Sequence, residues 1–277
     1  MKNYFTIYDG KKLAGFGSLI QAQLVLRAYC KIKKLNYRFP GFTKVHHWQL
    51  ESKSPELFSS TLNKFYNLPL EELDSNSVYI SHLYLIKFWL EFNINRVIKI
   101  NNEIYTNNFR VKNRVSIHYR VRLKTDTESE SAFKKDNFRY CSQEYYEASI
   151  KYCRRILGEK IKIDLFCIHQ DSFTDYLKKK YSVNIILDCP IVPTFINFIE
   201  SKAFITSSSS LSWAAHLYGL NELVIAKPFW HPWKQNSILI NNNGKVLKNG
   251  LSIPMIKRKI TSLSSFYFRK YSKDYHF

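Results

Sequence analysis

Residues 203–216 read A-F-I-T-S-S-S-S-L-S-W-A-A-H, an apolar run, then four serines, then a second apolar run. The first run predicts a buried strand over residues 203–206 and the second a helix over residues 212–218. Backbone N–H groups and hydroxyls then converge at the helix N-terminus, an arrangement that binds phosphate through hydrogen bonds and the helix dipole. The alternative is a serine-rich capping turn without a ligand.

The same alternation of strand and helix extends on both sides of this stretch. Such alternation predicts a parallel, doubly wound α/β sheet. In sheets of this kind, ligands bind at the carboxyl ends of the strands, where the strand order reverses. We expect strands at residues 115–118, 162–168, 183–187, 203–206 and 222–227, and helices at residues 142–157, 173–181, 194–200 and 212–218.

The first 110 residues have a different pattern, which indicates a separate lobe. A glycine turn at residues 15–18 precedes a predicted helix at 19–34, then a strand at 35–39 and a helix at 78–92. With 277 residues, the chain is long enough for two lobes. We therefore expect an N-terminal lobe at 1–110, a ligand-binding lobe at 111–255, and a basic, aromatic tail at 256–277. The tail is expected to be a solvated terminal element with some aromatic anchoring, and the alternatives are that it packs back as a helix or touches anionic lipid.

Composition narrows the partners. The formal net charge of +20 attracts phosphorylated substrates, nucleic acid or anionic membrane. No apolar stretch of 18 residues occurs and Asp9 interrupts the start, so we expect a cytoplasmic protein, with peripheral membrane contact as an alternative. The five cysteines lack C-x-x-C spacing, which favours reduced thiols and predicts no metal site.

Residues 115–126, V-S-I-H-Y-R-V-R-L-K-T-D, carry an unusual charged face. Period-two alternation places His118, Arg120 and Arg122 on one side of an extended chain. If this strand and the serine strand are neighbours, Arg120 and the turn at 207–210 face one cleft. An Arg fork opposite a helix N-terminus would stabilise a diphosphate leaving group as negative charge builds on it.

These motifs resemble those of the fucosyltransferase superfamily. The H-Y-R at 118–120 is similar to its His-x-Arg motif, and residues 205–215, I-T-S-S-S-S-L-S-W-A-A, are similar to I-S-N-S-S-F-S-W-W-A-A of the alpha-1,2 branch. Further similar segments are the helix at 140–150, the strand end at 165–171, the segment at 223–230 and the glycine turn at 15–18.

The resemblance implies two Rossmann-like lobes that face across a cleft (GT-B type). The activity that it implies is transfer of L-fucose, with inversion and without metal, from GDP-fucose to a hydroxyl of a glycan acceptor. No cofactor is expected beyond this donor substrate. Arg120 would grip the donor β-phosphate, Asp171 would contact the base, and Trp213 would be a packing residue. The residues it assigns to donor binding are His118, Arg120, Arg122, His169, Asp171, Ser208, Ser209, Ser210, Gly15 and Gly17.

Two departures from the family pattern leave the donor sugar open. Residues 121–123 are V-R-L where the alpha-1,2 branch has R-G-D, and residues 169–171 are H-Q-D where it has S-D-D. Another nucleotide sugar, such as a UDP sugar, is therefore an alternative. So is a catalytically inactive glycan-binding relative.

The catalytic base and the acceptor contacts stay open as well. An inverting transfer needs a base for the acceptor hydroxyl proton. Asp126 is the nearest carboxylate after the His-x-Arg segment, and the other candidates are Glu128, Glu130, Asp9, His46 and His47. The aromatic segment 229–233 would stack on an acceptor sugar or pack between the lobes.

A third class of function is a nucleic-acid-binding protein, which would use the charge of +20 together with 19 Tyr and 20 Phe. The sequence has no aromatic strand motif of the RNA-binding type and no helix-turn-helix pattern. We therefore expect no nucleic-acid partner.

Overall fold

The computed structural model of the chain describes residues 4–7, 15–42, 45, 54–66, 77–80, 109–120, 140–228, 233 and 237–247. Within these ranges the fold is mixed α/β, with one sheet of three strands and one of seven. The expected fold class is confirmed. Arg122, Asp126 and the other base candidates lie outside the described residues, as does the tail at 256–277.

The seven-stranded sheet has the order β10-β9-β8-β7-β4-β5-β6, and only the pair β10 and β9 is antiparallel. The order reverses between β4 and β7, because β5 and β6 extend the sheet on one side of β4 whereas β7 and β8 extend it on the other. The strands are β4 (Lys112–His118), β5 (Lys162–Cys167), β6 (Asn184–Leu187), β7 (Ser201–Ile205), β8 (Leu223–Ala226), β9 (Ile238–Ile240) and β10 (Val246–Leu247).

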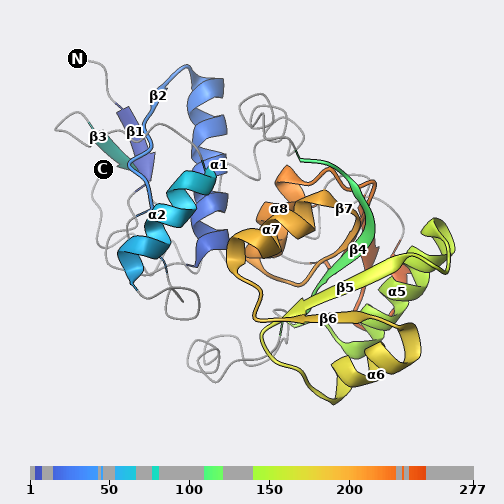
Figure 1. The fold of residues 1–277 in the computed structure, drawn as a ribbon. Coiled ribbons are helices and arrows are strands. Elements are labelled where there is room, and N and C mark those ends of the chain that lie inside the picture. Colours follow the sequence, from blue (N-terminus) through green and yellow to red (C-terminus); the bar gives the residue numbers. More distant parts are fainter. Residues whose placement is uncertain are drawn as a thin grey trace, which may run out of the picture.

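Helices cover both faces of this sheet, as the sequence pattern predicted (Figure 1). One face packs under α5 (Gln143–Leu157) and α6 (Ser172–Tyr181), in a hydrophobic cluster that includes Val115 and Ile117. The other face packs under α7 (Ile191–Glu200) and α8 (Ser210–Tyr218), in a cluster that includes Phe204 and Trp213. In β7, for example, Ala203 and Ile205 enter one cluster and Phe204 the other, because successive side chains of a strand point to opposite faces.

The three-stranded sheet belongs to the N-terminal part of the chain. Its strands are β2 (Asn36–Tyr37), β1 (Tyr4–Ile7) and β3 (Ser77–Ile80), in that order and parallel. The helix predicted over 78–92 is wrong at its start, because residues 78–80 form β3 and pair with β1. The run Val78-Tyr79-Ile80 is β-branched and aromatic, and a partner strand stabilises it as a strand.

Helix α1 (Phe16–Lys33) joins the two parts of the molecule. Thirteen of its residues are buried, and the buried apolar residues lie on every side of the helix. Phe16, Leu24 and the α2 (Pro55–Tyr66) residue Leu62 share one hydrophobic cluster with Phe195 and Trp213 of the seven-stranded part. Figure 1 shows α7 and α8 between α1 and the large sheet.

A glycine makes the close approach of α1 to α8 feasible. A Cβ on Gly17 would lie 2.4 Å from the backbone nitrogen of Leu211 and 2.5 Å from its Cα. Any side chain at position 17 would therefore force the two helices apart. The N-terminus of α1 and the N-terminus of α8 consequently meet at one point.

No helix among the described residues is long and apolar enough to cross a membrane.

Candidate active site

The site forms where the strand order reverses, at the carboxyl ends of β4 and β7. These strands pair in parallel, and Ile117 of β4 lies opposite Ile205 of β7. His118 ends β4, and the serine turn at 206–209 follows β7 directly and leads into α8. The sequence condition that both segments lie on neighbouring strands is therefore met.

The His118 imidazole lies against three serine hydroxyls. Its Nδ1 is 2.7 Å from Oγ of Ser212, 3.0 Å from Oγ of Ser207 and 3.4 Å from Oγ of Ser209. The ring also stacks on Phe198 of α7, with centroids 5.2 Å apart. Residues from β4, α7 and the serine turn thus hold the imidazole in one orientation.

The same hydroxyls organise the start of α8. Ser209 is the N-cap, and its Oγ accepts the backbone N–H of Ser212 at 3.1 Å. The Oγ of Ser212 in turn accepts the backbone N–H of Ser207 at 3.1 Å. The serine run thus caps the helix, as one of the two alternatives expected, and it also contacts His118. Phosphate binding by this turn stays a prediction.

The environment keeps the His118 imidazole neutral. Burial, together with the smaller effect of the positive charge of Arg120, lowers the pKa of His118 to about 3. A neutral imidazole is a hydrogen-bonding group at physiological pH and carries no charge.

Arg120 lies over the first residue of the segment that precedes α5. Its guanidinium carbon is 5.9 Å from the centroid of the Tyr140 ring. The next residue, Cys141, places its Sγ 3.8 Å from Oγ of Ser208, and burial raises its thiol pKa. The carbonyl of Tyr140 accepts a hydrogen bond from Nζ of Lys227 at 2.6 Å, so a second cation borders this edge.

The three serines assigned to donor binding differ in exposure. Ser208 and Ser209 are buried, and their hydroxyls are directed at Cys141 and at His118. Ser210, the first residue of α8, is half-buried. Of the three, Ser210 is therefore the one whose side chain is open to a ligand.

The carboxylate of Asp171 is already engaged within the fold. One oxygen accepts the backbone N–H of Thr174 at 2.8 Å in a capping box of α6, and the other accepts the Tyr119 hydroxyl at 2.7 Å. Burial and this bond to Asp171 raise the pKa of Tyr119. These contacts show an architectural use for Asp171, whereas its neighbour His169 is exposed.

The two glycines differ in their surroundings. Gly15 is the N-cap of α1 and has open space where a Cβ would lie, whereas Gly17 abuts α8. Gly17 therefore serves helix packing beside the serine turn.

Sequence reasoning missed the roles of Ser207 and Ser212. Both lie in the quoted serine stretch, but their contacts with His118 span 89 and 94 residues of sequence. The spacing of three between Ser209 and Ser212 is typical of a helix cap and could have located part of the network. Among the described residues, no cluster of three or more His, Cys, Asp or Glu could hold a metal ion.

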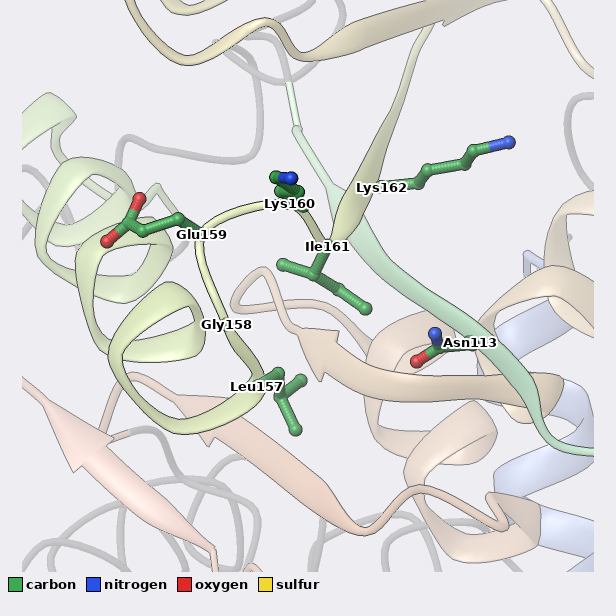
Figure 2. Close-up of a pocket in the computed structure, with 7 residues that line it drawn as sticks. All are labelled: Asn113, Leu157, Gly158, Glu159, Lys160, Ile161 and Lys162. Atoms are coloured by element: carbon green, nitrogen blue, oxygen red, sulfur yellow. The ribbon is translucent and has the colours of Figure 1, made fainter.

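A hollow of about 440 Å³ lies at the opposite edge of the sheet (Figure 2). It is formed by Asn113 at the amino end of β4 and by residues 157–162, the turn between α5 and β5. This hollow is separate from the His118 site, because it lies at the amino end of β4 and His118 lies at the carboxyl end. Ligands of parallel sheets bind at the carboxyl ends of the strands.

Comparisons with known proteins give similarity of fold at low identity. No model of a protein family matches the chain, and no curated protein is significantly similar to it. The chain is similar to the E. coli heptosyltransferase WaaC with ADP (10% identity, 95% of this chain and 99% of that chain, TM-score 0.43). It is also similar to POFUT1 in complex with GDP (9%, 79% and 96%, 0.39) and to the fucosyltransferase NodZ from Bradyrhizobium (9%, 89% and 98%, 0.39).

Proposed function

We propose that the protein is a glycosyltransferase that uses a nucleoside-diphosphate sugar as donor. The single observation that carries this proposal is the pairing of β4 with β7, which brings His118 into contact with the serine turn at the point where the strand order reverses. This is where doubly wound sheets bind their ligands. A neutral imidazole, a guanidinium and a helix N-terminus suit the diphosphate of such a donor.

The chemical step would follow from how these groups meet negative charge. When the bond between the sugar and the diphosphate breaks, charge builds on the departing oxygen. Arg120 would neutralise part of that charge, and the N-terminus of α8 would contribute its backbone dipole. Because the Ser209 cap and the adjoining strand β7 hold the N-terminus of α8, this group needs little reorganisation during the reaction.

The finer part of the proposal is transfer of L-fucose from GDP-fucose to a glycan hydroxyl, with inversion. It rests on the likeness of residues 118–120 and 205–215 to fucosyltransferase motifs. Asp126 is the proposed base for the acceptor hydroxyl. Thr174 and Tyr119 already engage the carboxylate of Asp171, which does not support contact of Asp171 with the guanine of the donor. A different nucleotide sugar is therefore the second candidate for the donor.

Thermal-shift measurements with GDP-, UDP-, ADP- and dTDP-sugars test the donor. A ligand at 100 times its dissociation constant stabilises the folded state by about 2.7 kcal/mol, which is a readily measured shift. We expect GDP-fucose and GDP to stabilise the protein. Stabilisation by UDP-sugars alone would show that the donor is a UDP-sugar and not GDP-fucose. If none of the four kinds of nucleotide sugar stabilises the protein, the proposed function is contradicted.

A further inference from the structure

The proton of the neutral His118 ring can reside on either ring nitrogen, and the groups around the ring decide which nitrogen carries it. Three hydroxyls surround Nδ1, and each carries one proton to donate. Nε2 makes no hydrogen bond to a described residue, and it is not among the fully buried unpaired polar atoms of the described chain. Nδ1 therefore faces the serine turn, and Nε2 is the ring nitrogen that the serine hydroxyls leave without a contact.

The hydrogen bonds around Ser212 indicate the direction of its own proton. Its Oγ already accepts the backbone N–H of Ser207, and its shortest contact, 2.7 Å, is with Nδ1 of His118. Ser207 donates its hydroxyl to Ser209 at 3.2 Å. The Oγ of Ser212 also lies 3.2 Å from Oγ of Ser207, a contact in which either hydroxyl can donate, but its 2.7 Å contact with Nδ1 is the shorter of the two. The shorter contact favours a Ser212 proton that is directed at Nδ1, which makes Nδ1 an acceptor.

We infer that Ser212 is a positioning residue that fixes His118 as the neutral tautomer with its proton on Nε2, so that the ring donates a hydrogen bond to the donor diphosphate. The role in donor binding rests on the proposed function, whereas the tautomer does not. A ring protonated on Nδ1 would turn a lone pair toward the anion and repel it. The hydrogen bond at one ring nitrogen thus sets what the other nitrogen offers.

The surroundings of the ring favour this neutral state. Among the described residues, Phe198 and the three serines that pack on the imidazole carry no charge, and the field of the Arg120 charge reaches the ring. Positive charge and burial both oppose a second proton on the ring.

The first measurement is a long-range ¹H–¹⁵N spectrum of the wild-type protein at neutral pH. The His118 signals are assigned as those that disappear in His118→Gln. We expect the pattern of a neutral ring with the proton on Nε2. A proton on Nδ1, or on both nitrogens, would overturn the inference. This result needs no variant at position 212, so it holds even if Ser212→Ala fails to fold.

The second measurement uses Ser212→Ala, with Ser149→Ala as the matched control. Ser149 is equally buried, but its hydroxyl donates to the carbonyl of Tyr145 and does not touch His118. In Ser212→Ala we expect the His118 titration midpoint to rise and the share of Nε2–H to fall, since the neutral ring loses its donor. If His118 is identical in the two variants, Ser212 has no positioning role.

Calorimetric binding of GDP and of inorganic diphosphate tests the functional consequence. In Ser212→Ala we expect the affinity for both ligands to fall roughly tenfold or more, which is the usual effect of losing a hydrogen bond to a charged group. In Ser149→Ala we expect the affinity to be unchanged. In the His118→Gln background, Ser212→Ala should have no further effect, because its action passes through the ring. An equal loss in both backgrounds would overturn the inference.

The two proposals fail in different ways. A wild-type protein that binds neither nucleotides nor diphosphate contradicts the proposed function. A wild-type ring with its proton on Nδ1 contradicts the tautomer even when GDP binds.

Discussion

Arg120 and His118 are two residues apart, and the structure gives them different neighbours. His118 faces three serine hydroxyls, whereas Arg120 lies over the Tyr140 ring. A guanidinium keeps its charge at any physiological pH, and the imidazole stays neutral here. The pair therefore combines one charged group and one uncharged hydrogen-bonding group at the same edge of the sheet.

Replacement of Arg120 by Ala should nearly abolish sugar transfer and leave the fold intact. Loss of one group that stabilises developing charge typically lowers kcat by about 10²- to 10³-fold. The measurement is transfer rate with GDP-fucose, together with circular dichroism. Arg155→Ala is the control, because Arg155 also lies over a tyrosine ring, Tyr152 at 4.7 Å, but at the other end of α5. Full activity of Arg120→Ala would contradict the proposed site.

His118 should make the folded state less stable in acid. Its pKa is about 3 in the fold against an ordinary 6.5, so below pH 6.5 the unfolded chain binds a proton that the folded chain does not. Stability should be full above pH 6.5 and decline as the pH falls toward 3, by at most about 1.4 kcal/mol per pH unit for one proton.

The measurement is the free energy of unfolding in urea at several pH values. His118→Gln should show a shallower decline between pH 6.5 and pH 3 than the wild type does. Equal slopes in the two proteins would contradict a depressed pKa at His118.

At the scale of elements, the meeting of α1 with α8 depends on position 17. A Cβ at Gly17 would overlap the backbone of Leu211, whereas a Cβ at Gly15 meets nothing within 4 Å. The first turn of α8 carries the serine network, so the packing of α1 also bears on the site geometry.

Gly17→Ala should therefore destabilise the protein, although Ala is the better helix former. Forced overpacking typically costs about 1–3 kcal/mol, which exceeds the roughly 1 kcal/mol that Ala gains over Gly in a helix. Gly15→Ala is the matched control and should cost less than Gly17→Ala, because it meets no neighbouring atom and loses only the preference for Gly over Ala at an N-cap. Urea unfolding of both variants is the measurement, and equal stabilities would show that α1 and α8 do not pack as described.

At the scale of the whole molecule, the hydrophobic clusters decide how the chain unfolds. One cluster contains Leu24 of α1, Leu62 of α2, Phe195 of α7 and Trp213 of α8, so residues of both sheets' helices share it. Two regions with a common core lose their packing together.

We therefore expect a single cooperative transition in urea, seen alike by circular dichroism and by tryptophan fluorescence. Leu24→Ala, which removes a fully buried side chain, should shift that whole transition by about 2–5 kcal/mol. Two separate transitions, or a Leu24→Ala effect on only one of them, would mean that the two parts fold independently.

The net charge of +20 attracts both nucleic acid and phosphorylated nucleotides, and the dependence of binding on salt distinguishes the two. A nucleic-acid-binding protein would bind RNA with a steep dependence on salt. We expect GDP binding to persist at a salt concentration that abolishes RNA binding. RNA binding without any nucleotide-sugar binding would favour the nucleic-acid function instead.

The sequence by itself determined the order of elements in the C-terminal part and the serine turn as the start of a helix. Period-two runs and helical spacing act between near neighbours, so they can be inferred locally. The same local reasoning was wrong over residues 78–80, because a distant partner strand decides between helix and strand there.

Only the tertiary structure decided which of these elements meet. The place of β7 beside β4 puts His118 on Ser207 and Ser212, and the packing of α1 sets Gly17 against Leu211. It also engaged Asp171 with Tyr119, which no local pattern shows. The physical reason is that strand order and helix contacts follow from the burial of apolar faces across the whole chain. The spacing of residues within one segment does not specify which strands pair or which helices pack together.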